Sequence, residues 1–102
     1  MEMILTGRMI TAEEACNYGI LNFTYSAEEL EIKTMEIANT IASKSPYAIE
    51  RAKRSVKAVS QMNLEEGLKL EREMFIKCAN SEDGKEGITA FIEKRKPDFK
   101  GR

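Results

Sequence analysis

Residues 81–101 read SEDGKEGITAFIEKRKPDFKG, and this stretch decides how the carboxyl end of the chain folds. Ser81 is followed by Glu82 and Asp83, which is the pattern of a helix start. A serine side chain accepts a hydrogen bond from a first-turn amide, and acidic groups complement the positive end of the helix dipole. Apolar residues then recur three and four positions apart until a proline interrupts a basic run. The stretch therefore predicts a capped helix that leads into a basic, proline-broken tail.

Four more helix starts lie upstream, each marked by a side chain that can cap orphan amides. They are Thr11 with Glu14, Ser26 with Glu29, Ser45 before Pro46, and Asn63 before Leu64-Glu65-Glu66. A short helical end at residues 2–6, closed by Gly7, precedes them. We therefore expect an all-α fold: a small bundle of about five helices, in one domain over residues 1–102.

Apolar stripes within these ranges predict the core-facing sides of the helices. One segment departs from helical spacing, because residues 20–25 alternate after Gly19 and place Leu21, Phe23 and Tyr25 on one face. This segment predicts a short strand, the only one expected, and such a strand needs a pairing partner. The stripes predicted as core are Leu30, Met35, Ile37, Ala38 and Ile41; Ile49, Ala52, Val56 and Val59; Leu64, Leu68, Phe75 and Cys78; Ile88, Phe91 and Ile92.

Composition excludes several classes of function. The chain has 102 residues, 42% of them apolar, and a net charge of −1, so no global field would attract nucleic acid or an anionic membrane. There is no histidine, which argues against Ser-His or Cys-His nucleophiles and most catalytic zinc sites. No apolar run approaches the length of a membrane span. Cys16 and Cys78 favour two small buried thiols in a reducing cytoplasm over a disulfide.

No residue pattern here marks a catalytic acid/base pair, a phosphate loop, a metal site or a cofactor site. Most paired glutamates lie in predicted first turns, where the helix dipole favours them. The basic cluster of the tail has two interpretations: it binds phosphate oxygens, or it is a solvated end that aids solubility. The cluster comprises Lys94, Arg95, Lys96, Lys100 and Arg102 against Glu93 and Asp98.

The ending A-F-x-E-K-R-x-P-x-F-x-G, formed by residues 90–101, resembles the carboxyl terminus of the enoyl-CoA hydratase/isomerase (crotonase) family. Residues 1–22 resemble the stretch of that family which leads into its helical region. Ser45-Pro46 and Leu64-Glu65-Glu66-Gly67 resemble two middle motifs. The resemblance covers essentially the whole chain. Met1 begins partway through the family pattern, so we expect either a truncated fragment or a free-standing helical remnant.

The resemblance implies a C-terminal helical domain without the spiral βα domain that supplies the family's oxyanion hole and catalytic carboxylates. In the family, these helices close over the acyl-CoA site and pack subunits into trimers. A Phe and a Lys of the last helix approach CoA, often that of a neighbouring subunit. By motif position these are Phe91 and Lys94, which would cover apolar surface and pair with phosphate respectively. No catalytic residue is implied.

We therefore expect the C-terminal part of an acyl-CoA hydratase or isomerase that covers the acyl-CoA site, forms a homodimer or trimer, and is inactive alone. The alternative is a non-catalytic helical module for self-association. Binding of nucleic acid is disfavoured because only Phe99 interleaves aromatically with the basic tail. The expected location is the cytoplasm.

Overall fold

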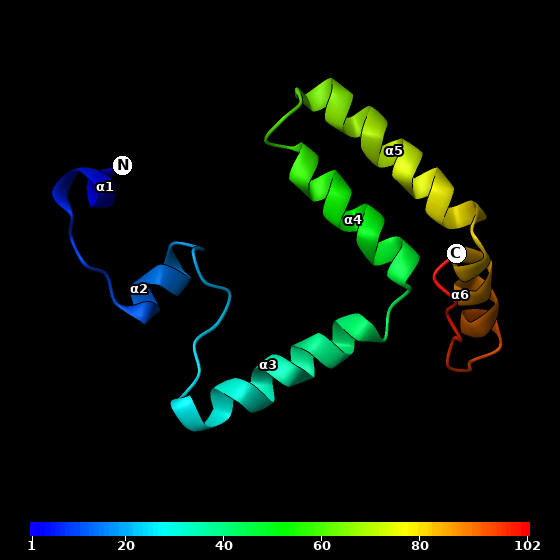
Figure 1. Cartoon of the computed structure of the whole chain (residues 1–102), viewed down its shortest axis with the longest axis horizontal. Coiled ribbons are helices and arrows are strands. Elements are labelled where there is room, and N and C mark those ends of the chain that lie inside the picture. Colours follow the sequence, from blue (N-terminus) through cyan, green and yellow to red (C-terminus); the bar gives the residue numbers. More distant parts are fainter. The chain divides into compact units, whose positions relative to one another are not determined.

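The computed structural model describes all 102 residues and confirms the all-α fold: it has six helices and no strand (Figure 1). Five begin where the capping residues predict, and the sixth is the short helical end at the amino terminus. The helices are α1 (Glu2–Thr6), α2 (Ala12–Asn17), α3 (Ala27–Ala42), α4 (Pro46–Ala58), α5 (Leu64–Asn80) and α6 (Glu82–Ile92).

The predicted caps form. The Thr11 side chain accepts the Glu14 amide at 3.1 Å, and the Glu14 carboxylate accepts the Thr11 amide at 2.9 Å, which completes a capping box. Asn63 makes the same reciprocal pair with Glu66 at the start of α5. Gly7 ends α1 with φ 65°, a left-handed conformation that glycine adopts without steric cost.

Residues 20–25 form no strand, so the predicted strand is wrong. The amides of Ile20 and Leu21 both donate to the carbonyl of Ala15, at 2.8 and 3.2 Å, and so complete the end of α2. Gly19 makes this possible with φ 71°. Amides that are bound to a helix end cannot pair with a neighbouring strand, and Phe23 and Tyr25 make only a local ring contact, with centroids 6.1 Å apart.

The chain divides into two compact units, Met1–Ile37 and Ala38–Arg102. In the first, Ala15 of α2 is the one buried residue. In the second, α4 and α5 pack side by side and α6 packs against both (Figure 1). The buried side chains of the second unit are Ser45, Ala58, Met74, Asp83 and Ala90.

Most of the large apolar side chains that were predicted as core are exposed, and this prediction needs correction. Val56 is 73% exposed, Phe75 71% and Phe91 85%, and α3 contains no buried residue. A helix in a single layer buries only the side that touches its neighbour, so its remaining apolar surface needs a second layer. Cys16 and Cys78 are half-buried rather than buried, and unpaired.

Candidate functional site

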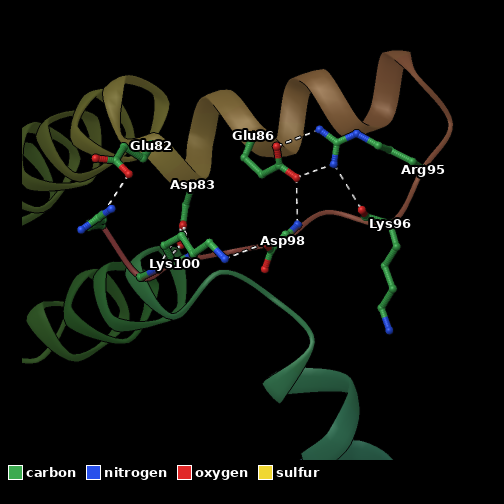
Figure 2. A network of polar contacts seen from close by, with 9 residues as sticks. Glu82, Asp83, Glu86, Arg95, Lys96, Asp98 and Lys100 are labelled. Atoms are coloured by element: carbon green, nitrogen blue, oxygen red, sulfur yellow. Dashed lines mark hydrogen bonds and ion pairs between the residues drawn. The ribbon is translucent and has the colours of Figure 1, made fainter.

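The tail turns back along α6 and is attached to it by charged groups (Figure 2). The helix ends at Ile92, and the chain turns away at Lys94, whose backbone is left-handed, before it returns beside α6. The polar contacts then pair successive tail residues with earlier and earlier positions of α6: Asp98 with Glu86, Lys100 with Asp83, and Arg102 with Glu82.

Asp83 is the centre of the first attachment and is only 2% exposed. Its carboxylate accepts the Ser45 hydroxyl at 2.6 Å, the Lys100 amide at 2.6 Å and the Gly101 amide at 3.0 Å. Its own amide donates to the carbonyl of Arg102 at 2.9 Å. Burial raises the pKa of Asp83, but the hydrogen bonds from Ser45 and the tail amides outweigh it, so the pKa lies below its ordinary value. One ionised carboxylate thus joins the start of α4, the start of α6 and the tail.

Glu86 makes the second attachment, one turn further along α6. It receives both terminal nitrogens of Arg95, at 2.6 and 2.8 Å, and the amide of Asp98 at 2.8 Å. The Nε of Arg95 donates to Glu93 at 2.6 Å. The guanidinium of Arg95 and the Asp98 amide lower the pKa of Glu86 to about 2. A two-pronged guanidinium–carboxylate pair fixes direction as well as distance, which defines the path of the tail.

Lys94 lies between α6 and this second attachment, with a left-handed backbone at φ 54°. It is the only residue other than glycine with a positive φ. The Lys94 amide donates to Phe91 at 3.3 Å and the Arg95 amide to Ala90 at 3.0 Å, the two bonds of a Schellman helix end. The Lys94 side chain is exposed and pairs with no carboxylate, so its charge is available to a ligand.

Phe91 lies one turn before Lys94 and is 85% exposed. It lines an apolar hollow of about 420 Å³ together with Ile88 and Phe99. Gly87 forms part of its wall, where a Cβ would lie 3.5 Å from the ring of Phe99. Phe91 and Lys94, the two residues expected to contact CoA, thus lie three positions apart at the carboxyl end of α6, and Phe91 lines the apolar hollow.

Asp83 and Glu86 are the site residues that sequence reasoning missed. The sequence pattern marks Asp83 only as a first-turn acid and gives Glu86 no role. Their spacing of three residues places them on the same side of α6, which was the available signal. Their partners in the tail lie 9–18 residues away, beyond the reach of a helical pattern.

No group of three or more His, Cys, Asp or Glu side chains is arranged to hold a metal ion. No helix combines the length and apolarity that crossing a membrane requires.

Comparison with known proteins places these features in a family. The sequence model described as enoyl-CoA hydratase/isomerase matches residues 1–102. The carnitinyl-CoA dehydratase of Proteus mirabilis is 43% identical over 99% of this chain and 40% of its own length. The mitochondrial enoyl-CoA hydratase of Pongo abelii is 43% identical over 98% of this chain and 34% of its own.

Solved structures agree with the sequence match. The enoyl-CoA hydratase of Bacillus anthracis superposes with a TM-score of 0.92 at 40% identity, over 99% of this chain and 39% of that protein. The chain spans about 40% of the length of the relatives it matches. The chain therefore belongs to the enoyl-CoA hydratase/isomerase family.

Proposed function

We propose that residues 1–102 form the C-terminal helical domain of an acyl-CoA hydratase or isomerase, and that this domain covers the acyl-CoA site without supplying its catalytic groups. The relatives it resembles carry names of enzymes that act on CoA thioesters, which supports the CoA moiety as the shared ligand. A single helical domain in the cytoplasm, without a resident cofactor, is part of the same proposal.

The observation that carries the proposal is that an exposed Phe91 and an exposed Lys94 without a carboxylate partner both lie at the end of α6. An exposed aromatic ring offers apolar cover to a nucleotide base or an acyl chain, and an unpaired ammonium suits a phosphate oxygen. Phe91 and Lys94 would thus contact CoA, by stacking and by charge.

The same geometry argues against a catalytic role for the nearby carboxylates. Asp83 and Glu86 are both held ionised by hydrogen-bond donors, so neither has a proton to give near neutral pH. Asp83 is 2% exposed and accepts the Ser45 hydroxyl and two tail amides. Glu86 is already engaged by the guanidinium of Arg95 and the Asp98 amide. Hydration or isomerisation would therefore depend on groups outside these 102 residues.

The test combines turnover with binding. Crotonyl-CoA hydration by this chain is expected to be absent, and calorimetry is expected to detect CoA binding that Lys94→Ala weakens. The matched control is Lys96→Ala, which removes the same charge from an exposed position two residues away. Turnover by the isolated chain would overturn the non-catalytic assignment. Equal effects of the two lysine variants would overturn the Lys94 contact.

A second candidate function, self-association as a helical module, is favoured by a different observation. Large apolar side chains are exposed on α4, α5 and α6, and exposed apolar patches promote association. We propose a homodimer or trimer. Self-association and acyl-CoA contact are compatible. If the chain associates but does not bind CoA, self-association alone is supported.

A further inference from the structure

The backbone of Lys94 needs an explanation, because a left-handed conformation is unfavourable for any residue with a Cβ. Glycine is the usual residue at this position of a helix end. Such a conformation persists only where the surroundings hold it in place, and it often occurs where function requires it. The helix-end hydrogen bonds of Lys94 and Arg95 are compatible with glycine as well, so they do not explain why a lysine is there.

The contacts on either side of Lys94 supply the restraint. The Glu86 carboxylate accepts hydrogen bonds from both terminal nitrogens of Arg95 and from the amide of Asp98. Residues 95 and 98 are therefore anchored to one side chain, which limits the paths open to the backbone before them (Figure 2). Downstream, Asp83 anchors the amides of Lys100 and Gly101, so the tail cannot slide along α6.

We propose that Glu86 is the positioning residue for Lys94: by holding Arg95 and the Asp98 amide, it fixes the left-handed backbone that presents the Lys94 ammonium to a phosphate oxygen of CoA. Glu86 does not touch the ligand. The assignment rests on the proposed function for its ligand, but the restraint on Lys94 is a property of the chain alone and is measurable without CoA.

The first test follows amide hydrogen exchange in the full chain. Glu86→Gln removes the charge and one acceptor, so protection of the Asp98 amide is expected to fall about tenfold or more. Protection of the Arg95 amide is expected to fall with it, because that amide reaches Ala90 only while Lys94 stays left-handed. Glu82→Gln is the matched control: it removes a carboxylate one turn earlier that pairs with Arg102 at the surface.

The second test is a double-mutant cycle on CoA binding. Glu86→Gln is expected to weaken CoA binding about tenfold where Lys94 is present, and to have no effect where Lys94 is already alanine. Arg95→Lys keeps the positive charge but loses the bidentate pair with Glu86, so it is expected to weaken CoA binding as Glu86→Gln does. It therefore tests the same contact if Glu86→Gln folds poorly.

The two tests separate the two claims. If the unaltered chain does not bind CoA, the CoA contact is wrong, and hydrogen exchange alone tests whether Glu86 positions Lys94. Lost protection at the Arg95 and Asp98 amides of Glu86→Gln supports that role, and unchanged protection overturns it. If CoA binds, additive effects of Glu86→Gln and Lys94→Ala would overturn the positioning role, since a residue that acts through Lys94 cannot act without it.

Discussion

At the scale of single residues, Lys94 combines backbone strain with an unpaired charge. Replacing it by glycine relieves about 1–2 kcal/mol of left-handed strain, offset in part by the extra freedom of glycine in the unfolded chain, about 0.5–1 kcal/mol. Lys94→Gly is therefore expected to raise the free energy of unfolding by about 0.5–1 kcal/mol, while weakening CoA binding. Urea denaturation measures the first effect and calorimetry the second. Loss of stability would contradict the strain argument.

Two glycines in helices form a natural matched pair. A Cβ at Gly84 would overlap the backbone carbonyl oxygen of Cys78, whereas nothing lies within 4 Å of a Cβ at Gly67. Gly84→Ala is expected to cost about 3 kcal/mol or more, because a backbone oxygen cannot move aside easily. Gly67→Ala is expected to stabilise by up to about 1 kcal/mol through helix propensity. Thermal denaturation measures the melting temperature of both variants. Similar shifts of the melting temperature would contradict the close approach of the end of α5 to Gly84 of α6.

At the scale of elements, the attachment of the tail to α6 makes stability depend on pH. The folded pKa of Glu86 is about 2, below its ordinary value of 4.5, so its ionised form favours the folded state. That stabilisation is fully present above about pH 4.5 and is lost as pH falls from there towards 2. Asp83 is shifted in the same direction.

The expected result is a urea midpoint that declines below pH 4.5, with a shallower decline in Glu86→Gln. Glu82→Gln keeps the steeper decline, because the pair of Glu82 with Arg102 is exposed and contributes little. Parallel declines in the unaltered chain and Glu86→Gln would show that other carboxylates dominate acid unfolding.

Local chemistry made the helices predictable, and the same chemistry shows why the strand prediction failed. Thr11, Ser45, Asn63 and Ser81 act within four residues, so their caps are legible in sequence. Alternation at residues 20–25 predicts a strand, but it does not account for the amides after Gly19, which donate to the carbonyl of Ala15. Gly19 is the signal that indicates this: like Gly7, it has a positive φ at a helix end, and the amides that follow it bond back to the helix.

The candidate site was predictable only in part, for a related reason. Phe91 and Lys94 belong to a motif that is contiguous in sequence. The contacts that hold the tail are not contiguous in sequence. Glu86 binds Arg95, and Asp83 binds Ser45 and the tail, only because the chain reverses its direction, and no periodic pattern predicts that reversal. Phe91 fits both the apolar stripe of α6 and the motif for CoA contact, and its 85% exposure excludes the core interpretation.

At the scale of the whole molecule, the apolar surface left uncovered is the dominant feature. The helical spacing of the apolar stripes on α4 and α5 predicts a core, but spacing alone does not say how many layers cover a helix. Val56, Val59, Leu64 and Leu68 line a hollow of about 360 Å³ on this pair of helices. Burying such side chains is favourable by roughly 25 cal/mol per Å² of apolar area, so contact of this surface with another apolar surface is favoured.

Self-association is the expected consequence at micromolar concentration, with a mass of a dimer or trimer by light scattering or sedimentation. Leu68→Gln places an amide in the hollow and is expected to raise the dissociation constant about tenfold, the effect of losing one well-packed apolar contact. Lys69→Gln is the control, because Lys69 is the next residue of α5 and lies in solvent, paired with Glu65. A monomer mass for the unaltered chain, or equal dissociation constants for both variants, would mean that this hollow takes no part in association.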